Sequence, residues 1–268
     1  MKIGLYKKVS KAYTQQDIEQ IKNLVISIGY EYVDISENRE KVDIILVLGG
    51  DGTILQAAMI ALEMDAPMLC VSCGYLGFLA EVGMNGLGDA LKKLKKEEFF
   101  YDDRNLLSVK SGDKEYLCLN EVVVKGDAFK LVDLDVYLND NFLSSYKTDG
   151  VIVASSTGST AYNLSAGGPI IFPDTEAIII TPVCSHSLTI RPLVVSAKDK
   201  IKIMATDSNC AFSVDGNPEV RGDKLIVQVE FSRKKIRFIR FDKYSFIKGL
   251  QNKLNWSGKF SKSYDKEA

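Results

Sequence analysis

The chain has 268 residues, of which 46% are hydrophobic and 26% are charged, a balance typical of folded globular proteins. Its 34 basic and 35 acidic residues give a net charge of -1, so no overall positive charge attracts nucleic acid or an anionic membrane. The segment from Met1 lacks the apolar core of a secretory signal, and apolar runs such as 44–48 are too short to cross a bilayer. We therefore expect a cytoplasmic protein.

The cysteine and histidine content narrows the chemistry. Five cysteines is an odd number in a chain of ordinary core size, so reduced thiols are expected. Cys70 and Cys73 match a CxxC pattern, but no second ligand pair has a spacing that suits zinc, and core or strand-end thiols are favoured. The single histidine, His186, excludes a multi-histidine metal site, and we favour a loop-stabilising role over proton transfer.

The first hundred residues alternate between strand and helix patterns. Thr14 and Asp17 form a plausible helix cap before apolar residues at helical spacing, and lysines line the solvent side of a later helix. The expected strands are residues 2–6, 42–48 and 68–72, and the expected helices are 18–28, 54–62 and 87–96. This alternation predicts an N-terminal Rossmann-like α/β domain over residues 1–100.

From about residue 101 the pattern changes to short strands separated by Gly, Asn and Asp. The clearest expected strands are residues 132–136, 201–205, 225–231 and 235–241. In the last of these, Arg237 and Arg240 alternate with Phe238 and Phe241, which indicates an outward-facing strand edge rather than nucleic-acid contact. Residues 101–241 are therefore predicted to form an all-β, β-sandwich-like domain.

The C-terminal segment has an apolar stripe at approximate helical spacing: Tyr244, Phe246, Ile247, Leu250, Leu254 and Trp256. Such a stripe usually packs in a core. We therefore expect residues 242–268 to complete the first domain through a helix that packs back on it, with a frayed polar end beyond residue 256.

Gly49, Gly50, Asp51, Gly52 and Thr53 lie between the second expected strand and the helix after it. The glycines allow a close approach of the backbone to a ligand, and the N-terminus of the helix favours phosphate. A carboxylate at this position would repel phosphate unless it accepts a hydroxyl proton or holds Mg²⁺. The alternative is a tight turn in which Asp51 only caps the helix.

A second candidate segment is rich in hydroxyls. A strand leads into residues 155–160, in which every residue except Gly158 carries a hydroxyl group, and Tyr162 follows. Small hydroxyls and free N–H groups suit phosphate or a base edge, and the Tyr162 ring offers a stacking surface. An ordinary polar loop is the alternative.

Three weaker signals complete the set. Asn120 and Glu121 precede an expected strand, and an adjacent amide and carboxylate can bind ribose hydroxyls or an amino group. Asp215 with Gly216 is first a hairpin-turn signal. Phe78 lies in an apolar, glycine-containing loop and could supply an aromatic lid or merely pack.

Taken together, the motifs resemble those of NAD kinases over nearly the whole chain, from Met1 to about Trp256. In order, they are Gly49-Gly50-Asp51-Gly52-Thr53, Leu76-Gly77-Phe78, Asn120-Glu121, Thr157-Gly158-Ser159-Thr160-Ala161-Tyr162, and His186-Ser187-Leu188 before Arg191-Pro192. The GGDGT turn alone is shared with lipid kinases and phosphofructokinase-like enzymes. The Asn-Glu pair and the TGSTAY segment narrow the resemblance to NAD kinases. The chain departs from the family's usual pattern where Ser156 and Ser185 replace prolines.

The resemblance implies transfer of a phosphoryl group from ATP, or polyphosphate, to the 2′-hydroxyl of the NAD adenosine ribose. It makes Asp51 the carboxylate that acts on the hydroxyl. The implied substrate-binding residues are Gly52, Phe78, Asn120, Glu121, Asp149, Ser159, Thr160, Ala161, Tyr162 and Asp215, and the phosphate-binding residues are Gly49, Gly50 and Thr53. It further implies Mg²⁺ or another divalent cation without a dedicated protein site, and a homodimer or homotetramer.

Other functions stay open at this stage. A related lipid or sugar kinase would share the glycine-rich turn, although no membrane-facing surface is evident. A non-catalytic dinucleotide-binding sensor would retain the binding residues without turnover. A nucleic-acid-binding β domain is disfavoured by the charge balance.

Overall fold

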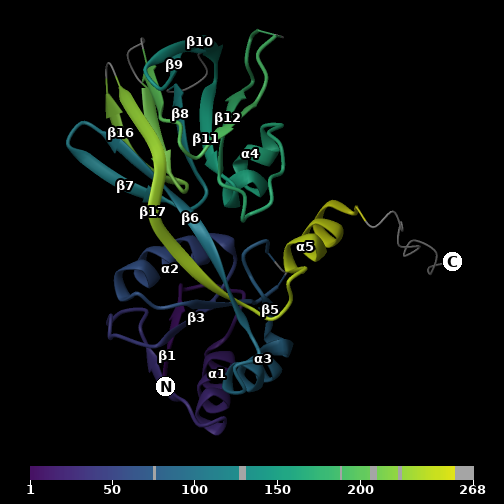
Figure 1. Ribbon diagram of the computed structural model, residues 1–268. Helices are drawn as coiled ribbons and strands as arrows, with labels where there is room; N and C mark the ends of the chain where they lie inside the picture. The colour runs from purple at the N-terminus through teal and green to yellow at the C-terminus, as the bar shows by residue number, and fades with distance from the viewer. Residues whose placement is uncertain (75–76, 127–130, 188, 206–209, 223–224, 257–268) are drawn as a thin grey trace, which may run out of the picture. The chain divides into compact units, whose positions relative to one another are not determined.

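The computed structural model describes residues 1–74, 77–126, 131–187, 189–205, 210–222 and 225–256. The chain forms two compact units: unit 1 comprises residues 1–102 and 237–268, and unit 2 comprises residues 103–236. Figure 1 shows the elements of each unit. Two motif residues of the sequence, Leu76 and Leu188, lie outside the described residues. In the described part of the chain, no helix has the length and apolar character needed to span a membrane.

Unit 1 is an α/β unit built on a parallel sheet. Its strands run in the order β5-β4-β3-β1-β2, and the end of β17 pairs with β4 through Phe238 and Met68. The strands are β1 (Lys2–Lys7), β2 (Glu31–Asp34), β3 (Ile44–Leu48), β4 (Met68–Ser72), β5 (Val82–Gly83) and the end of β17 (Ile226–Arg240). The helical segments are α1 (Gln15–Ser27), α2 (Asp51–Met64), the short 3₁₀ turn η1 (Met84–Gly86), α3 (Leu87–Lys95) and α5 (Ser245–Leu254).

The core of unit 1 follows from its apolar patterning. Strands β3 and β4 are buried along their whole length, as expected for strands covered on both faces. Helices α1 and α3 pack on one face, where Ile21 and Leu91 join Leu46 in one cluster. Figure 1 shows α2 on the other face of the sheet.

Unit 2 consists of two antiparallel sheets. One has the order β10-β9-β14-β17, with β6 paired to β17 and β7 paired to β6, and the other has the order β13-β12-β11-β8-β15-β16. The bounds are β6 (Phe100–Ser111), β7 (Lys114–Cys118), β8 (Glu121–Gly126), β9 (Val132–Leu138), β10 (Asn141–Thr148), β11 (Gly150–Ser155), β12 (Ala177–Val183), β13 (Leu193–Ser196), β14 (Ile201–Ala205), β15 (Cys210–Val214) and β16 (Asn217–Gly222). Two short helical segments, η2 (Thr157–Thr160) and α4 (Tyr162–Ser165), follow β11.

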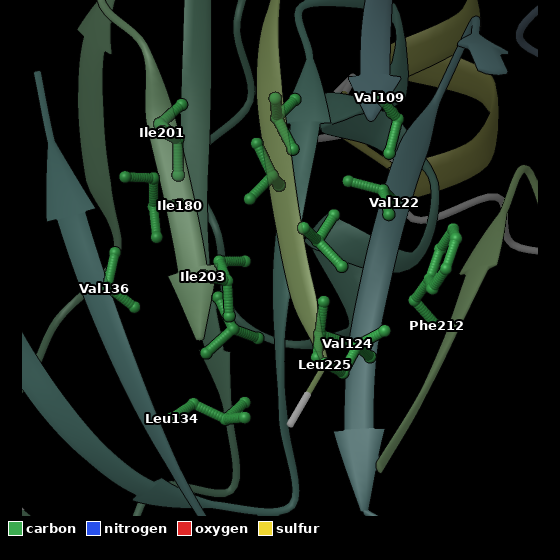
Figure 2. Packing of buried hydrophobic residues seen from close by; sticks show 14 of the residues in the cluster. Val109, Val122, Val124, Leu134, Val136, Ile180, Ile201, Ile203, Phe212 and Leu225 are labelled. Carbon is green, nitrogen blue, oxygen red and sulfur yellow. The ribbon is translucent and has the colours of Figure 1, made fainter. Parts of the chain in front are cut away.

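The two sheets of unit 2 share a hydrophobic core. Inward-facing residues alternate along the strands, as in the buried Ile201 and Ile203 of β14 and Val122 and Val124 of β8. Figure 2 shows these side chains and Phe212 of β15 in the same core. This arrangement confirms the expected β-sandwich-like unit and leaves the strand ends and connections to carry the candidate site.

Most expected elements of the α/β region are present, and the expected cap of α1 is confirmed. Thr14 and Asp17 form a reciprocal capping box, in which the Asp17 N–H donates to Thr14 Oγ1 at 3.2 Å and the Thr14 N–H donates to Asp17 at 2.6 Å. One boundary was wrong. The two strands expected at 225–231 and 235–241 are one continuous strand, β17, because the polar residues between them keep the strand conformation rather than forming a turn.

The expected C-terminal helix is present as α5 and belongs to unit 1. Its apolar stripe was expected to be core, and this was wrong for much of its length. Leu250 is buried, whereas Tyr244 and Trp256 are 65% and 61% exposed. Its contacts with the Phe78 segment and Asp51 come from Phe246, Gly249 and Lys253, which lie on one side of the helix.

Candidate functional site

The glycine-rich turn after β3 places Asp51 at the first position of α2. Gly49 has φ +154°, and a Cβ there would lie 2.7 Å from Thr53 Oγ1, so only glycine fits without a shift. Gly50 is the N-cap residue, and its carbonyl accepts the N–H groups of Thr53 and Ile54. A Cβ added at Gly50 or Gly52 would meet no described atom within 4 Å. The first N–H groups of α2 therefore lie at an open surface, a geometry that suits phosphate.

The Asp51 carboxylate is oriented by the segment 77–79. It accepts the N–H groups of Phe78 and Leu79, both at 3.4 Å. A Cβ at Gly77 would overlap Asp51 Oδ1, so this close approach requires glycine. Asp51 is only partly buried and can still meet a substrate hydroxyl or a hydrated cation. The structure thus brings together Asp51 and Phe78, which the sequence placed 27 residues apart.

Helix α5 adds a cation to this region. Lys253 Nζ lies 3.9 Å from Asp51 Oδ2 and 4.3 Å from the centroid of the Phe78 ring. The Phe78 ring is 6.2 Å from that of Phe246, and a Cβ at Gly249 would lie 3.3 Å from Phe78. Sequence reasoning missed Lys253, because a lone lysine in an amphipathic helix carries no local signal of its partner.

A buried ion cluster supports the Phe78 segment from behind. Arg240 donates to Glu81 at 3.1 Å, to Asp102 at 3.2 Å and to the carbonyl of Leu79 at 3.1 Å, and its side chain is 4% exposed. The expectation that Arg240 faces outward on a strand edge was therefore wrong. Its charge is offset by two carboxylates that approach from distant parts of the sequence, while Arg237 does face solvent and pairs with Asp65 at 2.6 Å.

In unit 2, the Asp215 carboxylate holds the segment that carries Asn120 and Glu121. Asp215 and Gly216 form the two-residue turn between β15 and β16, both with positive φ, as the Asp-Gly signal predicted. The Asp215 side chain accepts the N–H groups of Leu119 at 2.8 Å, Asn120 at 2.7 Å and Glu121 at 3.2 Å. Burial raises the pKa of Asp215, and these N–H groups oppose that rise.

Glu121 is a buried carboxyl group with a free oxygen. Its Oε2 is buried and has no hydrogen-bond partner among the described residues. Burial and the neighbouring Asp215 raise its pKa to about 8, although the backbone N–H of Tyr162 partly offsets the rise. An unpaired buried oxygen is costly and indicates a position where a bound ligand would supply a partner.

Most hydroxyl groups expected to be free for a ligand are used inside the fold. Ser155 Oγ donates to the carbonyl of Leu119 at 2.5 Å, and Ser159 Oγ donates to that of Ile171 at 3.1 Å. Ser156 Oγ donates to the carbonyl of Thr175. Each of these three hydroxyls thus already donates to a backbone carbonyl within unit 2, and the assignment of Ser159 to substrate binding stays a prediction.

The segment from Ser159 to Tyr162 nevertheless lies beside the Asn120–Glu121 pair. A Cβ at Gly158 would overlap the carbonyl oxygen of Asn120, so glycine permits the contact. Thr160 and Ala161 are partly exposed, and Tyr162 is 42% exposed. The Tyr162 ring is thus accessible for stacking on a base.

Asn163 is a buried residue of this region that sequence reasoning did not use. Its Nδ2 donates to the carbonyls of Ser159 and Pro169, both at 3.0 Å, and its Oδ1 accepts from Thr181 Oγ1 at 2.6 Å. A Cβ at Gly168 would overlap the Asn163 side chain. Asn163 therefore fixes the TGSTAY segment against the following loop and against β12.

Asp149 and His186 are placed at the surface of unit 2. Asp149 is exposed. Its backbone carbonyl accepts the N–H of Gly126, and its backbone N–H donates to the carbonyl of Val183. His186 is also exposed, and its N–H donates to the carbonyl of Lys147 at 2.9 Å. The structure brings neither side chain into the hydrogen-bond network around Asn120.

Comparison with known proteins decides the family. The family model described as ATP-NAD kinase N-terminal domain matches residues 2–99, and that described as ATP-NAD kinase C-terminal domain matches residues 119–241. The chain belongs to the ATP-NAD kinase family. Its relatives include an NAD kinase of Caldicellulosiruptor bescii, 33% identical over 95% of this chain and 99% of the relative. An NAD kinase of Thermoanaerobacter pseudethanolicus is 37% identical over 92% of each chain.

Solved structures of this family share the fold. A yeast NADH kinase complexed with NADH has a TM-score of 0.84 and 25% identity, over 97% of this chain and 89% of the other. An NAD kinase from Archaeoglobus fulgidus in complex with ATP has a TM-score of 0.77 and 25% identity, over 92% of this chain and 96% of the other. The expected combination of an α/β unit and a β-rich unit is thereby confirmed.

The described acidic and cysteine side chains do not form a closed metal centre. Among the described residues, no group of three His, Cys, Asp or Glu side chains is arranged to hold a metal ion. At the GGDGT turn, Asp51 is the one carboxylate of the motif. Any divalent cation there would need oxygen ligands from phosphate and water as well.

Proposed function

We propose that this protein is an NAD kinase, which transfers a phosphoryl group from ATP, or from polyphosphate, to the 2′-hydroxyl of the adenosine ribose of NAD. The observation that carries the proposal is the Asp51 carboxylate at the start of α2, held by the N–H groups of Phe78 and Leu79 at 3.4 Å beside the open glycine turn. This geometry pairs a proton acceptor with a phosphate-binding helix end. Family membership and the named relatives support the substrates.

In the proposed reaction, a bond forms between O2′ of the ribose and the terminal phosphorus, and the bond from that phosphorus to its bridging oxygen breaks. Asp51 accepts the hydroxyl proton, and ADP or shortened polyphosphate leaves. Phosphoryl transfer depends mainly on positioning and charge neutralisation, so the backbone N–H groups of Gly50, Asp51 and Gly52, together with the side chain of Thr53, hold the donor phosphates. Gly49 contributes to the phosphate-binding turn through its positive-φ backbone conformation.

The dinucleotide-binding residues belong to unit 2. Glu121 Oε2 accepts a hydrogen bond from a hydroxyl or amino group of the adenosine in this proposal. The reason is that this atom is buried and has no hydrogen-bond partner among the described residues. Tyr162 supplies a stacking surface. Asn120, Asp149, Thr160 and Ala161 complete the proposed set of this unit. In unit 1, the resemblance assigns Gly52 and Phe78 to substrate binding. Ser159 and Asp215 contribute by holding the backbone, since their side chains are already hydrogen-bonded.

A divalent cation, Mg²⁺ in the first instance, fits this chemistry as a companion of the donor phosphates. Mg²⁺ is commonly held by one or two carboxylates together with phosphate oxygens and water, and the partly exposed Asp51 offers one such carboxylate. When bound, the cation would supply charge neutralisation on the transferring group. The chain's own residues orient the hydroxyl, accept its proton and hold the phosphates.

The decisive experiment assays NADP formation from NAD, ATP and Mg²⁺ by the purified wild type and by Asp51→Asn. We expect the variant to lose turnover by at least about 100-fold, the usual scale for a general base. The control is Asp89→Asn, which removes an exposed charge from α3 and should leave turnover within about twofold of wild type.

Each other outcome identifies an alternative. Near-normal turnover by Asp51→Asn would contradict the role of Asp51. A wild type that binds NAD but makes no NADP with ATP or polyphosphate would be a dinucleotide sensor. A wild type that phosphorylates a lipid or sugar and not NAD would be a related kinase.

We further propose a cytoplasmic homodimer or homotetramer. The resemblance to NAD kinases supports this assembly, and so does the edge strand β13, on which Leu193 and Val194 are 36% and 46% exposed. Size-exclusion chromatography with light scattering tests it, and a monomer at micromolar concentration would contradict it.

A further inference from the structure

The C-terminal helix α5 carries one charged side chain toward the candidate catalytic carboxylate. Lys253 Nζ lies 3.9 Å from Asp51 Oδ2, and its side chain is 30% exposed. The same ammonium group lies 4.3 Å from the centroid of Phe78, the residue whose N–H donates to Asp51. Lys253 therefore contacts both the carboxylate and the segment that orients it.

The placement of Lys253 is supported from the start of α5. Ser245, the first residue of the helix, donates through Oγ to Glu81 Oε2 at 3.1 Å, and the Phe241 N–H donates to Glu81 Oε1 at 2.8 Å. Glu81 is also held by the buried Arg240. The first turn of the helix then carries Phe246 and Gly249 against Phe78, and Lys253 follows about one turn later. The segment that orients Asp51 and the helix that carries Lys253 thus share one buried anchor.

Charge explains what Lys253 can do there. Asp51 is a negative group at a helix N-terminus that would also receive negatively charged phosphates, so the two anions repel each other. The pair is partly exposed, and such a pair adds little to folding stability. An ammonium group on Asp51 Oδ2 offsets part of the repulsion and leaves Oδ1, held by the Leu79 N–H, on the other side of the carboxylate.

We propose that Lys253 is a positioning residue for phosphoryl transfer, which holds the Asp51 carboxylate in its working orientation when the donor phosphates are bound. This inference rests on the proposed NAD kinase function. It assigns to the C-terminal helix a part in the chemistry, acting through Asp51 rather than by contact with the acceptor hydroxyl.

The test compares three variants of the full chain: Lys253→Met, Lys253→Arg and Lys248→Met. Lys248 is the matched control, because it lies on the same helix, is 63% exposed and pairs with Asp242 instead. For each protein, kcat, the KM for NAD, the KM for ATP and the melting temperature are measured with Mg²⁺ present.

We expect Lys253→Met to lower kcat by about tenfold with little change in the KM for NAD, the pattern of a lost interaction in the transition state. Lys253→Arg should restore kcat to within about threefold of wild type, since it keeps the positive charge. Lys248→Met should stay within about twofold, and all three melting temperatures should lie within about 3 °C of wild type.

The failing outcomes are distinct. An active wild type with an unaffected Lys253→Met would overturn the inference and leave the proposed function intact. So would a Lys253→Arg variant as slow as Lys253→Met, or a kcat loss that appears only with a lowered melting temperature, because either would indicate packing rather than charge. A wild type that forms no NADP would refute the function, and the role of Lys253 with it.

Discussion

The Asp215 carboxylate accepts the backbone N–H of Asn120 at 2.7 Å, although 95 residues separate them. A two-residue turn between β15 and β16 thereby sets the backbone at the start of β8. A carboxylate that accepts several N–H groups is a strong local constraint. The carboxyl group of Glu121 therefore depends on Asp215 for its position as well as for part of its electrostatic environment.

Asp215→Asn should destabilise the protein and weaken NAD binding. The amide replaces one acceptor oxygen by a donor that faces backbone N–H groups, at a cost of about 3 kcal/mol in the free energy of unfolding. Urea unfolding and the KM for NAD measure the two effects. The control is Asp113→Asn at an exposed turn, for which we expect less than about 0.5 kcal/mol. Equal stability of the two variants would contradict the assigned role.

Glu121 should make the free energy of unfolding depend on pH at values above those at which a glutamate ordinarily titrates. Its pKa of about 8 in the folded state lies above the ordinary value of 4.5, so folded Glu121 keeps a proton that the unfolded chain releases. Stability therefore falls as pH rises through this window, by up to about 1.4 kcal/mol per pH unit. Glu121→Gln should remove this fall, as unfolding curves at pH 5, 6, 7 and 8 would reveal.

The control for Glu121 is Glu176→Gln, which removes an exposed carboxylate of the same unit. It should follow the wild-type pH dependence throughout. Parallel curves for wild type and Glu121→Gln would show that Glu121 ionises in the folded state at its ordinary pH, contrary to the prediction.

Gly77→Ala should affect activity more than stability. The added methyl group would overlap Asp51 Oδ1, which is the end of a short side chain and can turn away while the backbone stays in place. We expect a loss of kcat of about tenfold or more with a stability change below about 1 kcal/mol. Gly83→Ala is the control, since its Cβ would meet Ser72 Oγ at an ordinary 3.9 Å. A fully active Gly77→Ala would exclude the role of this segment in orienting Asp51.

Arg240→Met should be among the most destabilising substitutions in unit 1. It leaves Glu81, whose side chain is 4% exposed, without its cationic partner, at a cost of about 3–5 kcal/mol. The exposed pair Arg39–Glu63 provides the control, and Arg39→Met should cost less than about 1 kcal/mol. Similar midpoints in urea for the two variants would rule out the buried cluster as an anchor.

The sequence predicted the elements whose causes are local. Strand β4 was expected at residues 68–72 and lies there, because a continuous apolar run specifies a strand covered on both faces. The same holds for the Thr14 cap and for the Asp215-Gly216 turn. At the candidate site, the glycine-rich turn and the position of Asp51 at the start of a helix could likewise be predicted from the residues next to them in the sequence.

The features that sequence reasoning missed depend on partners far along the chain. Arg240 follows a strand pattern typical of a solvent-facing side chain, but Glu81, 159 residues earlier, makes its burial possible. The hydroxyl of Ser155 belongs to a polar run that suits a ligand, but it donates to the carbonyl of Leu119, 36 residues earlier, at 2.5 Å. Lys253 has no signal without the fold, because its relation to Asp51 arises only when α5 packs on the Phe78 segment.

Unit 1 is discontinuous in sequence, since residues 237–268 return to it after all of unit 2. During synthesis the ribosome therefore delivers Asp51 early, and Arg240 and Lys253 last. Domains generally fold as units while the chain emerges, so unit 2 can complete its two sheets, apart from the end of β17, before unit 1 receives its final strand and helix. Until then, Glu81 lacks the arginine that neutralises its charge. A nascent chain that stops near residue 236 therefore has an incomplete unit 1, which chaperones would have to protect from aggregation.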